Sequence, residues 1–285
     1  MRVGEDMKKG VLLESFRKPF RESVKEAAVL GLDGVQIFAK SDAVHDGMTA
    51  TEVKEVKRIL DGEGLEVSAL CGDFGCRMYY YPNEMREEIE REKRILDLAK
   101  ELGTNIVTTH IGVVPEDFNT EEYENMAKVC RELAGFADSL DGHFAVETGP
   151  EPSARLKRFL DMLESRGVGV NLDPANLVMV SADDPVEAVY NLKDYIVHTH
   201  AKDGILLKKI DARRIYLPTV THVDPVNFDE CFKELPLGEG NVPWKHYLSA
   251  LKAIGYDGYL TIEREVGENP EKDISAAVKF LGELI

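Results

Sequence analysis

Short apolar runs alternate with longer stretches of helical periodicity along the chain, and this alternation limits the possible folds more than any other feature. Runs rich in Val, Ile and Leu between helical segments are typical of a parallel sheet with helical crossovers. Eight runs are predicted as strands: residues 10–13, 34–38, 66–70, 105–109, 143–147, 169–172, 196–200 and 258–263. Eight units without a break in composition predict an α/β fold, a (β/α)8 TIM barrel formed as a single domain over residues 1–285.

Glycines mark the ends of several predicted helices. Gly31, Gly103 and Gly255 each stand shortly before a predicted strand, where a left-handed glycine ends a helix and turns the chain. Two connections on the carboxyl side of the strands, residues 71–82 and 201–242, are longer than the others. Barrel enzymes build their active sites on that side, so we expect both connections to lie over the barrel mouth.

The composition fits a globular protein that acts on a small molecule. With 44% hydrophobic and 31% charged residues, the 285-residue chain can bury a core and keep a solvated surface. Its formal net charge of −17 is not offset by any local run of Lys and Arg. Such a chain repels a phosphate backbone, so we expect no nucleic-acid partner and a small neutral or weakly charged metabolite instead.

The cysteines and the apolar segments bear on location. Cys71, Cys76, Cys130 and Cys231 lack paired zinc-ligand spacing, and we expect them to be reduced thiols. The first apolar stretch, residues 10–13, is too short for a signal sequence, and no segment reaches membrane-spanning length. We therefore expect a cytoplasmic protein without a membrane partner.

Four successive strands end in side chains that can bind a metal. Glu147, Asp173 and Glu263 end or follow the fifth, sixth and eighth strands, and the seventh carries His198 and His200. The two histidines point in the same direction by strand alternation, so the pattern does not choose between them. In a barrel, neighbouring strand ends project toward one rim, and we expect these groups to converge there.

Convergence of three carboxylates and an imidazole requires a compensating charge. Taken singly, Glu147 can cap a helix, Asp173 can form a turn before a proline, and Glu263 can pair with Arg264. Together they would repel one another in an apolar setting unless protons or a cation compensate. We therefore predict one divalent metal ion. The oxygen-rich ligand set favours Mn²⁺, with Mg²⁺, Co²⁺ or Fe²⁺ as alternatives.

The strand endings resemble those of a known family. The segments that carry the resemblance are AVE at 145–147, NLDPAN at 171–176, VHTHAKD at 197–203, LGEGNVPW at 237–244 and GYLTIE at 258–263. In order and spacing they are similar to the xylose-isomerase-like sugar isomerase/epimerase family, over nearly the whole chain. The resemblance implies a mononuclear metal site of Glu147, Asp173, His200 and Glu263, with His198 one layer deeper in the barrel.

The resemblance also implies an activity. It is the isomerisation or epimerisation of a small ketose or related polyol-ketone through an enediolate that the metal stabilises, with Glu147 and Glu263 as the catalytic acid and base. Lys202 and Asp203 directly follow His200, and a lysine ammonium there can stabilise negative charge on a substrate oxygen or form a salt bridge. His110 ends the fourth strand and can contact substrate or a ligand carboxylate.

Asn176 marks a departure from part of the family. In the ketose 3-epimerases a substrate-binding histidine stands three positions after the metal-binding aspartate, where this chain has Asn176. An amide donates and accepts hydrogen bonds but carries no titrating proton near neutrality. The predicted substrate-binding residues are therefore His110, Asn176, Lys202 and Asp203. A structural role is the simpler interpretation for five others: Gln36, Cys71, Asp73, His222 and Glu239.

Three other functions remain open at this point. The first is a metal-dependent dehydratase (lyase) acting on an inosose or related keto-cyclitol, which also begins with proton removal beside a carbonyl. The second is an apurinic-site endonuclease, whose barrel is similar but which needs three metals, and which Asn176 and the acidic charge disfavour. The third is a non-catalytic sugar-binding barrel.

The glycine-rich turn Gly238-Glu239-Gly240 lacks the basic residues of a phosphate site, so we expect an unphosphorylated sugar as substrate. A homo-oligomer is a further possibility. Tyr79, Tyr80 and Tyr81 could supply an aromatic contact between subunits, or could equally fold over the barrel mouth.

Overall fold

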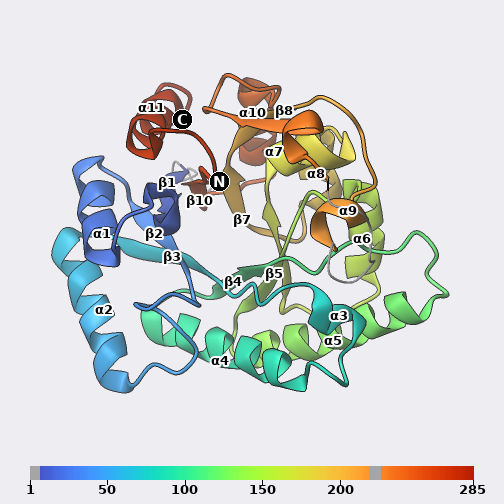
Figure 1. The fold of residues 1–285 in the computed structure, drawn as a ribbon. Helices are drawn as coiled ribbons and strands as arrows, with labels where there is room; N and C mark the ends of the chain where they lie inside the picture. The colour runs from blue at the N-terminus through green and yellow to red at the C-terminus, as the bar shows by residue number, and fades with distance from the viewer. Residues whose placement is uncertain (1–6, 218–225) are drawn as a thin grey trace.

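The computed structural model describes residues 7–217 and 226–285, and its centre is a closed barrel of eight parallel strands (Figure 1). Around the barrel the strand order is β1-β10-β7-β6-β5-β4-β3-β2. The strands are β1 (Lys8–Leu12), β2 (Gly34–Phe38), β3 (Glu66–Cys71), β4 (Ile106–Thr109), β5 (His143–Glu147), β6 (Val168–Leu172), β7 (Ile196–Ala201) and β10 (Tyr259–Ile262). The predicted (β/α)8 TIM barrel is confirmed, and each strand matches one of the eight predicted apolar runs.

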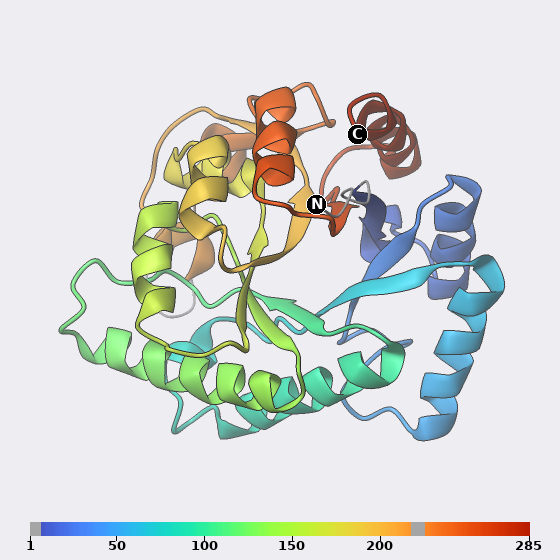
Figure 2. The ribbon, with the colours of Figure 1, turned by 180° about the vertical axis from the view of Figure 1, so that it is seen from behind.

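Helices cover the outside of the barrel, as the views from front and back show (Figures 1 and 2). The longer ones are α1 (Phe20–Val29), α2 (Ala50–Glu63), α4 (Arg86–Leu102), α5 (Glu121–Ser139), α6 (Ser153–Asp161), α8 (Pro185–Leu192), α10 (Trp244–Ala253) and α11 (Pro270–Gly282). Within residues 7–217 and 226–285, no helix is both long and apolar enough to cross a membrane.

Local sequence signals set where these helices begin and end. Thr49 and Glu52 form a reciprocal capping box at the start of α2, which satisfies backbone N–H groups that the helix itself cannot. Gly103 closes α4 with a φ of 96°, a left-handed conformation that a side chain would strain. The chain then turns directly into β4, as the sequence predicted for this helix–strand connection.

The barrel strands are buried on both faces. Val35, Ile37, Val146, Val170 and Leu260 have no exposed surface and belong to one continuous apolar core. Burying each such side chain contributes about 1.5–3 kcal/mol. Strands buried on both sides have continuous apolar runs rather than an alternating pattern, and this is why the eight strands can be recognised in the sequence.

The two long connections lie on the carboxyl side of the strands, but neither is a simple loop. The first holds the short helix α3 (Arg77–Tyr80), in which Tyr79 and Tyr80 are buried, whereas the next residue, Tyr81, is 39% exposed. Two of the three tyrosines thus pack inside the protein. The second connection contains an antiparallel pair of strands, β8 (Asp203–Leu206) and β9 (Phe232–Leu235). Its short helices are α9 (Arg213–Tyr216) and η3 (Phe228–Glu230).

Candidate active site

The strand ends bring Glu147, Asp173, His200 and Glu263 together at one rim of the barrel. One oxygen or nitrogen atom from each residue lies within 4.8 Å of the corresponding atoms of the other three. Their side chains come from the neighbouring strands β5, β6, β7 and β10, and all four residues are buried. We call this group the acidic centre.

The imidazole of His200 stands at the middle of the acidic centre. Its Nδ1 atom lies 3.2 Å from Glu263 Oε2, 3.5 Å from Glu147 Oε1 and 3.5 Å from Asp173 Oδ2. All three carboxylates therefore face the same ring nitrogen. A single cation at this position can be reached by every member of the group.

The other ring nitrogen of His200 is held by a glutamine on β2, which does not neighbour β7 in the barrel. Nε2 lies 2.9 Å from Gln36 Oε1, and Gln36 Nε2 donates to Thr108 Oγ1 at 2.8 Å. Because the amide is oriented by that second bond, the imidazole donates through Nε2 and turns Nδ1 toward the three carboxylates. Burial lowers the pKa of His200, but Glu263, Glu147 and Asp173 outweigh it and raise that pKa well above its ordinary value, so Nδ1 carries a proton unless a cation takes its place. Gln36, given a structural role from the sequence, therefore contacts the acidic centre.

His198 lies one layer deeper. Its Nδ1 is 2.9 Å from Asn171 Oδ1 and its Nε2 is 2.9 Å from Thr261 Oγ1, so both ring nitrogens are engaged inside the barrel. Burial and the neighbouring His200 hold the pKa of His198 well below its ordinary value, which keeps the ring neutral. Between the two histidines that the strand pattern left equivalent, the geometry singles out His200.

Opposing charges set the protonation of the two glutamates. Burial alone would raise the pKa of Glu263, but Lys202 and His200 outweigh it and hold that pKa well below its ordinary value. Burial likewise opposes ionisation of Glu147, and His110 and His200 again hold the pKa below its usual range. Both carboxyl groups are therefore ionised at neutral pH, which is the form that binds a cation or accepts a proton.

The donor set fits a divalent cation. Asp173 Oδ1 accepts a hydrogen bond from the backbone N–H of Asn176 at 2.9 Å, whereas Asp173 Oδ2 is buried and accepts none from the described residues. A buried carboxylate oxygen without a donor is costly unless a cation faces it. Three carboxylates with one imidazole suit the harder divalent metals. The buried acidic centre thus has the ligands and the spacing of a metal site.

Lys202 is buried beside the acidic centre. Its ammonium group lies 3.0 Å from Glu263 Oε2 and also contacts the exposed Glu265. Burial lowers the pKa of this lysine, but the two glutamates more than compensate and raise it well above its ordinary value. The lysine thus remains charged and fixes the orientation of Glu263.

Asn176 and His110 both reach Glu147. Asn176 Nδ2 donates to Glu147 Oε1 at 3.0 Å, and Asn171 Nδ2 donates to Glu147 Oε2 at 3.2 Å. His110 Nε2 lies 3.6 Å from Glu147 Oε1, while its Nδ1 lies 3.3 Å from Asp73 Oδ2. Burial lowers the pKa of His110, but Glu147 and Asp73 have the larger opposite effect, so the pKa is raised from its ordinary value to about 9. Asp73 therefore also belongs to the site.

The sequence predicted that Asp203 contacts substrate, but in the structure its carboxylate binds other parts of the chain. Its two carboxylate oxygens accept four hydrogen bonds of 2.9–3.1 Å, from the backbone of Gly204, Gly238 and Val242 and from Trp244 Nε1. All these donors except Gly204 come from the turn before α10 or from its first residue. This environment favours an anchoring role over contact with substrate, because the oxygens are already occupied.

Tyr216, in α9, was not singled out from the sequence. Its ring lies against His110, with 5.6 Å between the ring centroids. A long connection gives no periodic signal that would place one of its side chains over the barrel, so nothing in the pattern identified this residue. Among the weaker candidates, Cys71 is buried at the end of β3, Glu239 is exposed, and His222 lies outside the described residues.

Fold and site together define a class of protein, the parallel barrels that carry, at the carboxyl ends of their strands, a cluster of side chains able to hold a metal ion. The chain belongs to the xylose isomerase-like TIM barrel family, whose model matches residues 24–284. This confirms the resemblance found in the sequence. Within the described residues, the acidic centre is the only group of three or more such side chains close enough to share an ion.

Among curated proteins, the chain is 31% identical to the uncharacterized protein YfiH of Bacillus subtilis over 137 residues, 48% of this chain and 42% of that protein. It is 26% identical to an inosose dehydratase of Lacticaseibacillus casei over 171 residues, 58% of this chain and 55% of that enzyme. The chain thus spans about half the length of these relatives. A solved xylose isomerase domain protein from Planctomyces limnophilus has 25% identity and a TM-score of 0.77, over 100% of this chain and 98% of that one.

Proposed function

We propose that this chain is a metal-dependent isomerase or epimerase of a small, unphosphorylated ketose or related polyol-ketone. The observation that carries the proposal is the convergence of Glu147, Asp173 and Glu263 on one nitrogen of His200 in a buried setting. An acid/base pair of carboxylates around a cation suits the removal and return of a proton beside a carbonyl. The family match supports the same chemistry.

Glu147, Asp173, His200 and Glu263 would hold the metal ion, and Mn²⁺ is our first choice for this oxygen-rich set. When bound, a divalent cation supplies electrostatic stabilisation for the negative charge that proton removal leaves on the substrate. The chain itself keeps water away from this position, because all four residues are buried.

The two glutamates take different parts. Glu263 Oε2 is held by Lys202 and His200, whereas its Oε1 makes no hydrogen bond within the described residues. We assign Glu263 as the base that accepts the proton. Glu147 receives amide donors on both oxygens and lies beside His110. We assign it as the group through which a proton is returned, on the same or the opposite face of the substrate; because Glu147 is itself ionised, the charged His110 beside it supplies that proton, and Glu263 releases the one it accepted to solvent.

A dehydratase acting on an inosose-like ketone is the second candidate. The match to an inosose dehydratase favours it, as does Asn176, which takes the place of a histidine found in the ketose 3-epimerases. Both reactions begin with the same proton removal. They differ in the second step, which is either return of the proton or loss of a neighbouring hydroxyl as water.

Deuterium exchange separates these possibilities. The purified protein, loaded with Mn²⁺, is incubated in D₂O with a panel of ketoses and inososes and followed by NMR. We expect deuterium at the carbon beside the carbonyl with a changed sugar product, and loss of the signal after chelation and its return with Mn²⁺. Water elimination would establish the dehydratase. Inertness of the metal-loaded protein across the panel, or cleavage of abasic DNA, would contradict the proposal.

A control variant tests whether the activity arises at the acidic centre. Glu263→Gln removes the assigned base, whereas Glu239→Gln makes the same change at an exposed position of a nearby turn. We expect exchange to be lost in the first variant and retained in the second. Equal activity in both would show that the signal comes from a contaminating enzyme, and equal loss in both would show damage to the fold.

A further inference from the structure

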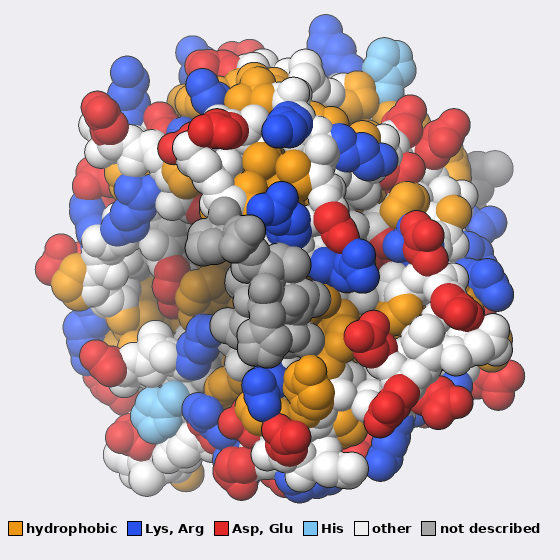
Figure 3. Space-filling model, turned by 45° about the vertical axis from the view of Figure 1, so that its right-hand side comes forward, with side chains coloured by type: hydrophobic (Ala, Val, Ile, Leu, Met, Phe, Trp, Pro, Cys, Tyr) orange, Lys and Arg blue, Asp and Glu red, His pale blue; other side chains and the backbone are white. Residues whose placement is uncertain are grey.

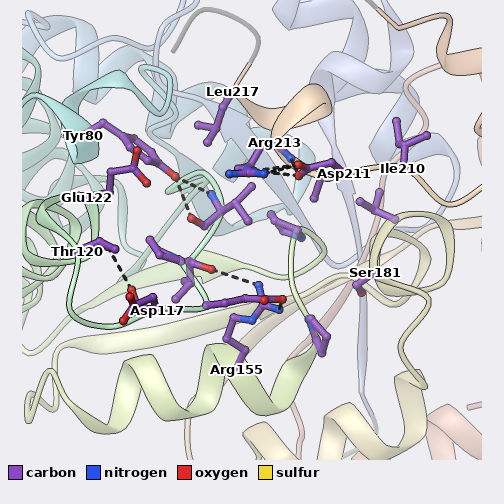
Figure 4. Close-up of a pocket in the computed structure, with 18 of the residues that line it drawn as sticks. Tyr80, Asp117, Thr120, Glu122, Arg155, Ser181, Ile210, Asp211, Arg213 and Leu217 are labelled. Atoms are coloured by element: carbon purple, nitrogen blue, oxygen red, sulfur yellow. Dashed lines mark hydrogen bonds and ion pairs between the residues drawn. The ribbon is translucent and has the colours of Figure 1, made fainter. Parts of the chain in front are cut away.

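A cavity of about 840 Å³ lies on the carboxyl side of the strands, the side that also carries the acidic centre. Figure 4 shows most of the residues that line it. Its walls come from the end of α3, from the segments after β4 and β5, from the end of η2 (Leu177–Ser181) and from the connection that holds α9. None of the four residues of the acidic centre lines it. We call it the outer cavity.

The outer cavity and the acidic centre are reached by the same two segments of the chain. After β4, His110 contacts the centre and Val113 lines the cavity. At the end of β5, Glu147 belongs to the centre and Pro150 lines the cavity. The same two segments therefore contribute residues to both sites. A ligand that occupies both sites would lie along the carboxyl rim of the barrel.

Tyr216 lies where the two sites adjoin. Its ring packs on His110, and its helix neighbours Arg213 and Leu217 line the outer cavity. A Cβ on Gly149 would come within 2.9 Å of the Tyr216 hydroxyl oxygen and 2.5 Å of Asn176 Cβ. A glycine at position 149 is thus what lets this tyrosine approach the residues around the acidic centre. Within the described residues the hydroxyl has no hydrogen-bond partner, so it is available to a ligand.

The charged side chains in the walls of the outer cavity are more often acidic than basic, and Lys209 is the one base among the described lining residues that is not paired with a carboxylate of the described chain. Arg213 is held by Asp211 through both sides of its guanidinium group, and Arg155 is paired with Glu116. Further acids, Asp117 and Glu122, also line it. Over the face shown in Figure 3, acidic and basic side chains are interspersed. Such walls disfavour a phosphate or another anionic group.

The remaining wall residues suit a neutral, hydroxyl-rich ring. Tyrosine, valine and proline side chains give apolar surface, and Thr120 and Ser181 carry hydroxyl groups. Pockets of about 300–1,000 Å³ enclose ligands considerably larger than one sugar ring. An outer cavity of about 840 Å³ therefore exceeds what a free monosaccharide bound at the acidic centre would use.

We propose that the outer cavity binds a second, neutral sugar ring joined to the ketone that reacts at the acidic centre. The substrate class is then a glycoside-like keto sugar rather than a free monosaccharide, with Tyr216 at the junction between the two rings. This inference rests on the proposed function for the reacting half of the substrate. The cavity itself is tested separately by binding.

Two tryptophan substitutions on the same connection provide the test. Ile210 lines the outer cavity, and Ile210→Trp fills part of it. Leu207, three positions earlier, is 48% exposed and does not line it, so Leu207→Trp is the matched control. Thermal unfolding and circular dichroism establish that both variants are folded before they are compared.

Binding is measured first, by titration calorimetry of the Mn²⁺-loaded protein with cellobiose and with glucose. We expect cellobiose to bind at least about tenfold more tightly than glucose, a gain of about 1.4 kcal/mol. The gain should disappear in Ile210→Trp and persist in Leu207→Trp. Equal affinities for the two sugars in the native chain, or an unchanged gain in Ile210→Trp, would overturn the proposal whether or not turnover is found.

Turnover then links the outer cavity to the reaction. For a keto sugar and its glucosylated form, we expect kcat/KM to be at least about tenfold higher for the larger molecule, and Ile210→Trp to remove that advantage while sparing the smaller one. Turnover without such a preference would refute the inference and leave the proposed function standing. Cellobiose binding without turnover of either ketone would refute the proposed function and keep the cavity as a sugar site.

Discussion

The acidic centre and the outer cavity lie side by side but are built by different means. The centre is formed at strand ends, where side chains such as His200 and Glu147 are buried and held by neighbours at fixed distances. The outer cavity is formed by connecting segments, and its ion pairs, such as Arg213 with Asp211, are about half exposed. In barrels of this kind the strand ends set the chemistry and the connections set what is admitted.

The largest effect is expected in the acidic centre. Glu263→Gln removes the assigned base and one charge of the metal site, so we expect kcat to fall by at least about 1,000-fold. Initial rates of the metal-loaded variant on the best ketone of the panel measure this, with metal content determined in parallel. A rate within tenfold of the native chain would show that Glu263 is not the base.

The second effect concerns Glu151, which lies between two prolines that line the outer cavity. It is buried, its Oε2 accepts a hydrogen bond from Val114 N at 2.9 Å, and burial raises its pKa from 4.5 to about 7. A carboxyl group whose folded pKa is raised stabilises the fold below pH 4.5 relative to pH 7, because the folded state binds the proton more tightly. Stability is therefore lost as pH rises through this window.

Glu151→Gln removes that dependence. We expect the variant to gain at most about 3 kcal/mol over the native chain at pH 8, and the gain to vanish near pH 4.5. Urea unfolding at several pH values, each with the same metal content, measures the difference. A gain that is constant with pH would mean that Glu151 is not protonated in the fold.

The third effect tests the boundary between the two sites. Tyr216→Phe keeps the ring against His110 but removes a hydroxyl that has no partner among the described residues. We expect kcat/KM to drop about tenfold and the stability to change by less than about 0.5 kcal/mol, because only a contact to substrate is lost. Michaelis kinetics and thermal unfolding check this. A purely structural role would instead lower stability and leave kcat/KM unchanged.

The smallest effect is expected within the outer cavity itself. Arg213 and Asp211 are 59% and 45% exposed, so their pairing contributes less than about 1 kcal/mol. Arg213→Met should therefore leave both stability and cellobiose affinity nearly unchanged in unfolding and titration experiments. A tenfold loss of affinity for a sugar phosphate in this variant, with tight binding in the native chain, would show that the cavity takes anions.

Much of the acidic centre could be predicted from the sequence, because strand ends in a barrel have a fixed geometry. Glu147, Asp173 and Glu263 end or follow apolar runs, and the parallel arrangement brings such positions to one rim whatever the helices do. The choice of His200 over His198 needed the resemblance to a family, since both point the same way along the strand. Its physical basis is the pairing of His198 with Asn171 and Thr261.

The outer cavity and the role of Asp203 could not be predicted in the same way. Tyr216 reaches His110 from a position more than one hundred residues away, and nothing periodic in the connection fixes that approach. The strands β8 and β9 are short and partly buried, so they leave no continuous apolar run. Asp203 directly follows His200 and Lys202 in the sequence, so the sequence assigns it to the same site. Its hydrogen-bond partners lie instead in the turn before α10 and at the first residue of α10.

The four hydrogen bonds that Asp203 accepts have a consequence for protein engineering. They hold the two ends of the β8–β9 insertion together, since Asp203 opens β8 and its donors Gly238 and Val242 follow β9. The segment between these ends can therefore be shortened or exchanged without moving His200. Grafting it from other members of the family is a direct route to changing what reaches the barrel mouth while the acidic centre stays the same.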